Sequence, residues 1–403
     1  MKSVSFLSTG RSVMGLFCVG LLLHCNAPEQ NPATLEQKEF ATHVNQSNET
    51  LNAGIISQRI PPEPITFTKY EYFDRQASMP AFTVLIPKGW KVAGGIAWTA
   101  NHSLPATSNF RFYNPNGSEE FFIFPTQSYF WTNNPLFLTT NPPGSLRFGT
   151  PVAQPVRLNA AFNHLVLNQY RKSAMDIQVR REENLPELAR LACGSPEPGL
   201  KAYADAGKFR ITYTENGKPK EEEMFTAVSQ FIINLPGSMT TPGYFINYWY
   251  VDFIFSCRAN FGKLDESASL FKTIIYSFDL NKTWYGKVVN VKNMLAQDIM
   301  QGIRKIGEIG TYIARSGSEM RENELNRWYA QQKIRDKISQ NFSDVYRGIE
   351  RYYDPFAEKE IELSNRYNYA WTNNLGEYYL TDSPSDNPNI GSNLTWQLME
   401  RQE

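Results

Sequence analysis

The sequence predicts an α+β fold: an antiparallel β-meander with packing helices, followed by a long helical hairpin and a small C-terminal β-hairpin. Three observations predict it. Apolar and polar residues alternate from Ile65 onward, and this period of two is typical of half-buried strands. Between residues 288 and 349, apolar residues recur mostly at three- or four-residue steps, the period of an amphipathic helix. Strand patterns return between Tyr367 and Thr381, around a turn near Asn373–Gly376.

The meander is expected between residues 61 and 285. Two predicted hairpin turns are the main support for this meander: a Pro-Asn-Gly turn at 115–117 and a Glu-Asn-Gly-Lys turn at 215–218. Asn-Gly favours a tight hairpin because both of its residues tolerate a positive φ. Helices are expected at 160–170 and 264–278, where apolar residues gather on one side of a helical period.

The helical hairpin is expected over residues 286–350. One apolar stripe runs from Val288 to Ile313 and a second from Trp328 to Ile349, with Ser316-Gly317-Ser318 between them. The alternative is one bent helix. In either case, a stripe of this length must pack on the body, on itself or on a partner.

Two short motifs resemble the Mog1/PsbP-like fold. They are the strand that ends in IPKGW (Ile86–Trp90) and the later helix that ends in FKTIIYSF (Phe271–Phe278). The resemblance covers about residues 62–285, although the insertion between the two halves is larger than that fold normally carries. Proteins of this fold are mostly binding and assembly factors without catalysis, so the resemblance implies a binding role and transfers no site residues.

The first 24 residues predict a lipoprotein signal peptide. Lys2 and Arg11 precede an apolar run at 13–23, which is too short for a membrane-spanning helix of about 20 residues. Leu22–Cys25 resembles a bacterial lipobox, with Cys25 as the lipid acceptor, although His24 replaces the usual small residue. Cleavage after Ala27 without lipidation, or an unprocessed thiol, remain the alternatives.

A polar tether is expected at residues 25–60. This segment is rich in Asn, Gln, Glu, Ser and Thr, and it has too few apolar residues to offset the entropy of ordering. The predicted location is therefore the outer membrane or the periplasmic face of a bacterial envelope, where a lipid anchor would hold the chain. The C-terminal segments 286–350 and 351–403, with WTNNLGEYYL and DNPN, resemble bacterial lipoproteins, and this resemblance brings no activity with it.

Charge and cysteine content narrow the functional classes. The 40 basic and 40 acidic residues balance, and removal of residues 1–24 leaves a net charge of −2. Because the sequence has no cluster of basic residues that could hold phosphates, nucleic-acid binding is disfavoured. Besides Cys18 and Cys25, the chain has Cys193 and Cys257. In an exported chain these two either form a disulfide or remain separate buried thiols.

Motifs for catalysis, metals and cofactors are missing from the sequence. Outside the first 60 residues, only His102 and His164 are histidines, and neither belongs to a zinc-binding spacing or a nucleophile elbow. Carboxylate runs such as Glu221–Glu223 lie on predicted strands, where neighbours point to opposite faces. We therefore expect no metal and no cofactor.

Aromatic residues are the remaining signal, at 14% of the chain. Exposed Tyr and Trp side chains make good binding anchors because they offer large contact area at low entropic cost. The candidates occupy two strands: Tyr248, Trp249, Tyr250, Trp371 and Tyr378. The alternative is an ordinary core with a solvated tyrosine face.

The leading interpretation is a cell-envelope lipoprotein with a non-enzymatic binding or assembly role, whose partner is an envelope protein or a glycan. One alternative is an envelope hydrolase whose carboxylates converge only in the fold. Another is an oligomeric structural lipoprotein built through the predicted helices.

Overall fold

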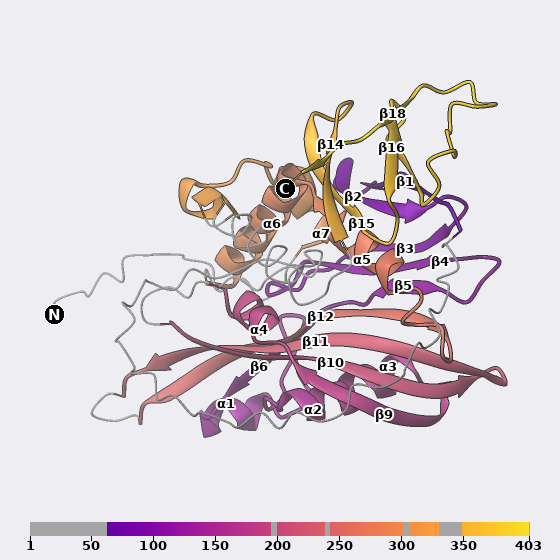
Figure 1. The fold of residues 1–403 in the computed structure, drawn as a ribbon. Coiled ribbons are helices and arrows are strands. Elements are labelled where there is room, and N and C mark those ends of the chain that lie inside the picture. Colours follow the sequence, from indigo (N-terminus) through magenta and orange to yellow (C-terminus); the bar gives the residue numbers. More distant parts are fainter. Residues whose placement is uncertain are drawn as a thin grey trace, which may run out of the picture.

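The computed structural model describes residues 63–194, 200–237, 242–300, 307–326, 328–329 and 349–402. The chain is a mixed α+β protein, and every pairing between its named strands is antiparallel (Figure 1). The α+β prediction is therefore confirmed. The signal peptide, Cys25 and the tether lie outside the described residues.

The largest sheet has eight strands, in the order β3-β4-β5-β12-β11-β10-β9, with β6 also paired to β12. Its strands are β3 (Lys91–Trp98), β4 (Ala106–Tyr113), β5 (Glu120–Ile123), β6 (Gln127–Thr132), β9 (Met175–Asn184), β10 (Leu200–Glu215), β11 (Lys218–Leu235) and β12 (Tyr244–Asn260). The predicted turn between β10 and β11 is confirmed: Asn216 and Gly217 have φ values of 51° and 72°, which suit a tight hairpin.

The second sheet has six strands, in the order β13-β2-β1-β17-β16-β18. Its strands are β1 (Ile65–Asp74), β2 (Met79–Pro87), β13 (Asp279–Leu280), β16 (Tyr369–Asn373), β17 (Glu377–Thr381) and β18 (Trp396–Leu398). The predicted C-terminal hairpin is confirmed as β16 and β17. This hairpin is continuous with the N-terminal strands, because Ile65 of β1 lies opposite Leu380 of β17.

Two smaller sheets complete the strand structure. They are a three-stranded sheet of β14 (Ile349–Asp354), β15 (Lys359–Ser364) and β19 (Arg401–Gln402), and a two-stranded sheet of β7 (Leu146–Arg147) and β8 (Thr150–Pro151). The named helices are α1 (Pro135–Thr140), α2 (Leu158–Ala161), the π-helix η1 (Phe162–Leu167), α3 (Asn168–Tyr170), α4 (Pro186–Cys193), α5 (Ala268–Tyr276), α6 (Lys282–Met300) and α7 (Ile309–Arg315). Residues 322–326 and 328–329 are helical as well.

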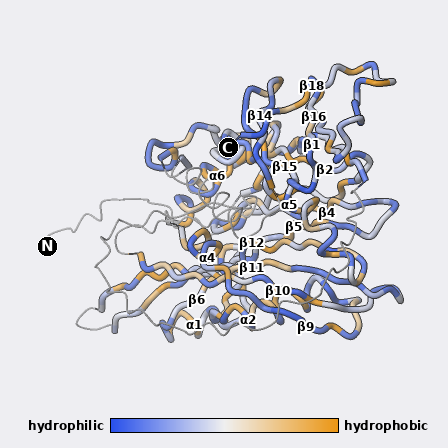
Figure 2. The backbone as a smooth tube through the Cα atoms, viewed as in Figure 1, coloured by the Kyte–Doolittle hydropathy of each residue, from blue (hydrophilic) through white to orange (hydrophobic). Residues whose placement is uncertain are grey.

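The core lies in layers on both faces of the eight-stranded sheet. Helices α2, η1 and α3 cover one face, while α4, α5 and α6 lie on the side of the six-stranded sheet (Figure 1). The largest buried cluster includes Phe82, Phe112, Phe271 and Trp284, and so joins both sheets to α5 and α6. Figure 2 shows apolar segments recurring along β10, β11 and β12 and along α6.

The described residues do not show the predicted long helical hairpin. Helix α6 is described as far as Met300, residues 301–306 lie outside the described part, and Gly307 and Glu308 are not helical, so the described part of the stripe from Val288 to Ile313 lies on two helices, α6 and α7. Ile349, the expected end of the second helix, begins strand β14. Residues 330–348 lie outside the described part.

One hairpin turn occurs twice. In the β1–β2 turn, Asp74 Oδ1 accepts hydrogen bonds from the backbone N–H groups of Gln76 and Ala77, at 3.0 and 3.2 Å. In the β14–β15 turn, Asp354 Oδ1 accepts from the second and third following residues in the same way, at 2.9 and 3.1 Å. Both aspartates are buried at the end of a strand, so each turn is held by its own carboxylate.

Candidate functional site

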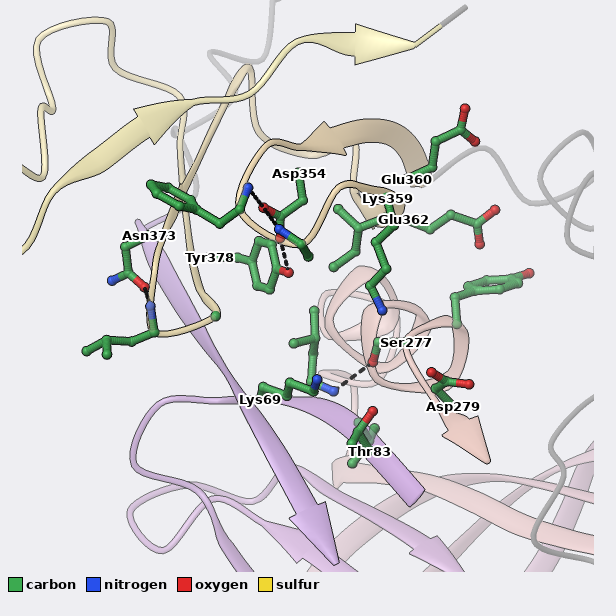
Figure 3. A pocket seen from close by; sticks show the side chains of 18 of the residues that line it. Lys69, Thr83, Ser277, Asp279, Asp354, Lys359, Glu360, Glu362, Asn373 and Tyr378 are labelled. Atoms are coloured by element: carbon green, nitrogen blue, oxygen red, sulfur yellow. Dashed lines mark hydrogen bonds between the residues drawn. The ribbon is translucent and has the colours of Figure 1, made fainter. Parts of the chain in front are cut away.

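A cleft of about 720 Å³ lies where the two C-terminal hairpins meet the N-terminal strands (Figure 3). Its volume is in the range of protein ligand sites. Four parts of the chain form its walls: strands β1 and β2, the segment after α5, the β14–β15 hairpin and the β16–β17 turn. The residues that line it include Lys69, Ser277, Asp279, Arg351, Asp354, Phe356, Lys359, Glu360, Glu362, Asn373, Leu375 and Tyr378.

The floor is organised by Asp354. With Oδ1 held by the turn, its Oδ2 accepts a hydrogen bond of 2.5 Å from the hydroxyl of Tyr378 on β17. Burial, and then the neighbouring carboxylate, raise the pKa of Tyr378 above its ordinary value, so the tyrosine remains a protonated donor. This bond ties the β14–β15 hairpin to the β16–β17 hairpin across the cleft.

The walls carry charges of both signs. Lys69 and Lys359 are exposed, and Figure 3 shows Lys359 extending from β15 into the space above Ser277. Exposed Asp279 and Glu360 are the acidic counterparts. The cleft is therefore a polar surface with no single sign of charge, which suits a partner that also carries both signs.

The edge of the cleft carries two exposed apolar side chains on turns. Phe356 of the β14–β15 turn is 39% exposed, and Leu375 of the β16–β17 turn is 62% exposed. The β16–β17 turn is rigid because Asn373 Oδ1 accepts hydrogen bonds from the N–H groups of Leu375 and Glu377, at 2.9 and 3.1 Å. Apolar side chains on held turns, beside charged walls, are typical of protein-binding surfaces.

Two of the four cleft carboxylates already have structural roles. Both Asp354 oxygens accept hydrogen bonds from the protein, and Glu362 Oε1 lies 3.7 Å from Arg351 Nε. These contacts explain why Asp354 and Glu362 are present without invoking chemistry on a substrate.

The structure places most of the predicted binding aromatics in the core. Trp249, Tyr250 and Tyr378 are 1%, 2% and 4% exposed, so they cannot act as exposed anchors. The Trp249 indole stacks on Tyr129 and donates a hydrogen bond to the carbonyl of Ala153. The middle of β12 is covered on both faces by other elements, which is why Trp249 and Tyr250 do not reach solvent.

The other two predicted aromatics are half-buried. Tyr248 packs edge-to-face against Phe130 and His102. Trp371 lies on β16, opposite Tyr379 of β17 and Leu398 of β18. Of the predicted set, only Tyr378 lines the cleft, and its hydroxyl already donates to Asp354.

The two cysteines of the body are free thiols in the structure. Cys193 ends α4, while Cys257 is buried on β12 with Phe255 and Ala259 in the largest core cluster. Burial raises the pKa of both thiols. No disulfide joins them in the structure, and of the two separate buried thiols given as the alternative, Cys257 is buried while Cys193 is half-buried.

The histidines have no shared site. His102 is half-buried, and desolvation lowers its pKa to about 4, while His164 is exposed on η1. Among the described residues, no group of three His, Cys, Asp or Glu side chains is placed to hold a metal ion. Within the same residues, no helix combines the length and apolar character needed to cross a membrane.

Sequence reasoning missed the cleft, although one signal for it was present. Tyr72-Phe73-Asp74-Arg75-Gln76-Ala77 and Tyr352-Tyr353-Asp354-Pro355-Phe356-Ala357 share the pattern Tyr-aromatic-Asp-x-x-Ala. The second copy marks the turn that carries Asp354 and Phe356. Comparison with protein-family models finds no match for this chain, and comparison with curated proteins finds none either.

Proposed function

We propose that the chain is a lipid-anchored protein of a bacterial cell envelope with a non-enzymatic binding or assembly role, and that its cleft takes a polypeptide segment of an envelope partner. One observation supports a polypeptide as the ligand of the cleft. The exposed apolar side chains of Phe356 and Leu375 lie beside walls that carry the exposed charges of Lys69, Lys359 and Asp279. A peptide segment offers both the apolar side chains and the mixed charges that such a surface complements.

The lipid anchor and the detailed fold assignment are parts of the same proposal. The leader and the polar tether support a lipid on Cys25, which would hold the body near a membrane surface. The proposed Mog1/PsbP-like arrangement of residues 62–285 and a helical hairpin within 286–350 rest on the sequence motifs. A fold used mostly by binding and assembly factors agrees with a docking role.

The lipid anchor predicts a labelling pattern. Cells supplied with labelled palmitate should incorporate the label into the wild-type chain and lose it completely in Cys25→Ser, because the thiol that would accept the lipid as a thioether is removed. Cys18→Ser, a matched change within the leader, should retain the label. Gel fluorography of the immunoprecipitated chain measures both, and a mature wild-type chain without label would contradict the anchor.

The cleft predicts a position-specific cross-link. A photo-crosslinking phenylalanine analogue at Phe356 or Leu375 should trap a discrete protein partner in intact cells. The matched control is Ile390, which is 78% exposed and does not line the cleft. Identical bands from positions 356, 375 and 390, or bands from none of them, would overturn the cleft as a docking site.

Charge reversal provides the quantitative test of the same cleft. Lys69→Glu with Lys359→Glu should weaken the captured complex about tenfold, since each lost surface ion pair is worth up to about 1 kcal/mol. Lys201→Glu, an exposed lysine on β10, is the matched control and should leave binding unchanged. Cross-link yield against salt concentration measures the effect.

A further inference from the structure

A second hollow lies on the eight-stranded sheet, on the face that α2 and η1 cover. It encloses about 450 Å³ between the strands and the segment that leads into α2. Three aromatic and three amide side chains share it: Trp131, Tyr203, Phe245, Gln154, Gln230 and Asn247. We call this hollow the sheet groove.

Strand register explains why these side chains meet. Asn247 of β12 lies opposite Trp131 of β6 on one side and Ile232 of β11 on the other. Tyr203 of β10 lies opposite Gln230 of β11. Directly opposed residues of antiparallel strands point to the same face, so the aromatic rings stand at the two sides of a row of amides.

The aromatic rings at the sides of the groove are accessible. Tyr203 is 56% exposed, while Trp131 and Phe245 are half-buried. Ordinary core aromatics on this sheet, such as Trp249, are almost fully buried. Rings that are held by the sheet yet reach solvent can stack against a flat ligand at low entropic cost.

Asn247 supplies an independent sign of a ligand. Its side chain is 2% exposed, and its Nδ2 donates a 3.0 Å hydrogen bond to Gln230 Oε1. Its Oδ1 is buried and has no hydrogen-bond partner among the described residues. A buried acceptor without a donor is costly, and here it belongs to a side chain that lines the groove, where a ligand hydroxyl could donate to it.

We propose that the sheet groove binds a neutral saccharide. Pyranose rings present an apolar C–H face that stacks on Trp and Tyr rings, and a rim of hydroxyl groups that pair with amide side chains. The only charged side chains lining the groove among the described residues are Arg157 and Asp205, both exposed and of opposite sign. Their balance favours an uncharged ligand over a phosphate or a carboxylate.

This site is separate from the cleft. The lining residues of the two hollows do not overlap, and the saccharide site does not depend on a polypeptide partner. A chain with both sites could hold an envelope glycan and an envelope protein at once.

The test is binding of neutral tetrasaccharides of glucose, N-acetylglucosamine, galactose and mannose to the purified full-length chain, kept in a detergent without a sugar headgroup. Titration calorimetry should detect at least one of them at millimolar or lower concentration. Tyr203→Ala and Trp131→Ala should each weaken that binding about three- to tenfold, in keeping with a single aromatic stacking contact. Asn247→Leu should weaken it by a similar factor through loss of the buried acceptor.

Tyr353→Ala is the matched control, since Tyr353 is an exposed strand tyrosine, at 42%, that does not line the groove. Tyr203 is exposed enough for its replacement to leave the unfolding midpoint unchanged, and this measurement separates lost binding from lost folding. Absence of binding to all four saccharides, or binding that survives Tyr203→Ala and Trp131→Ala unchanged, would overturn the proposal.

Discussion

Replacement of Arg171 by leucine is expected to lower the free energy of unfolding by about 3–5 kcal/mol, the usual cost of leaving one partner of a buried ion pair alone. Arg171 and Glu222 are 5% and 0% exposed. Arg171 Nε donates a 2.7 Å hydrogen bond to Glu222 Oε2, and Nη2 donates to Oε1. Without the guanidinium, Glu222 would keep the 2.7 Å hydrogen bond from the Tyr213 hydroxyl but would lose its ion-pair partner, so it would have to lose its charge or admit water into the core.

The control for this prediction is Arg190→Leu. Arg190 pairs with Glu187 on the surface of α4, where its side chain is 65% exposed, and a surface pair is worth only about 0–1 kcal/mol. Urea denaturation followed by circular dichroism measures both variants. A similar decrease in the free energy of unfolding in Arg171→Leu and Arg190→Leu would contradict a special role for the buried pair.

The Arg171→Leu effect should also depend on pH. Burial raises the pKa of Glu222, but Arg171, with smaller contributions from Ser256 and Arg258, outweighs burial and holds this pKa below its ordinary value of 4.5. The pair therefore stabilises the fold above about pH 4.5, and this stability is lost as the pH falls through the lowered pKa. We expect the difference between wild type and Arg171→Leu to be smaller at pH 4 than at pH 7.

Replacement of Asp74 by alanine is expected to cost about 3 kcal/mol or more, because it removes the acceptor of two buried indole N–H hydrogen bonds. Asp74 Oδ2 accepts hydrogen bonds from Nε1 of Trp98, at 2.8 Å, and from Nε1 of Trp284, at 2.7 Å. The carboxylate thereby joins β1 to β3 and α6. Its Oδ1 holds the β1–β2 turn as well.

Asp354→Ala is the matched variant, since Asp354 holds the same kind of turn but accepts from a single tyrosine hydroxyl. We expect Asp354→Ala to lower the free energy of unfolding less than Asp74→Ala does. Asp74→Asn should lower it by an intermediate amount, because one acceptor oxygen remains. Chemical denaturation followed by tryptophan fluorescence orders the three variants. An Asp74→Ala variant as stable as Asp354→Ala would contradict the indole contribution.

Local features of the fold were predictable from the sequence, and long-range ones were not. The alternation in β1 and the Asn216–Gly217 turn specify a strand and a hairpin through neighbouring residues alone. The pairing of β1 with β17 depends on residues more than 300 positions apart, and no local pattern records it. The apolar stripe from Val288 to Ile313 shows which side of each helix is buried, but it does not reveal the break at Gly307.

In the candidate site, too, local features were predictable from the sequence and long-range ones were not. Tyr378 was predicted as a binding aromatic because it lies in a tyrosine-rich strand, but its burial depends on a contact with Asp354 of another hairpin. The cleft brings Lys69 together with Lys359 and Asp279, and these residues come from three distant segments. The sheet groove needs Tyr203 and Trp131 on one face, which only the order of strands β10, β11, β12 and β6 provides.

The pairing of β1 with β17 has a consequence for biogenesis. Until the chain has been synthesised as far as Leu380, β1 has β2 on one side and an open edge on the other. Pairing over such a distance is slow to form, and an open edge is a hazard for aggregation. For a chain that follows the proposed export route, the delay is useful, since β1 gains its second neighbour only after β17 has arrived and the polypeptide stays unfolded while it crosses the membrane.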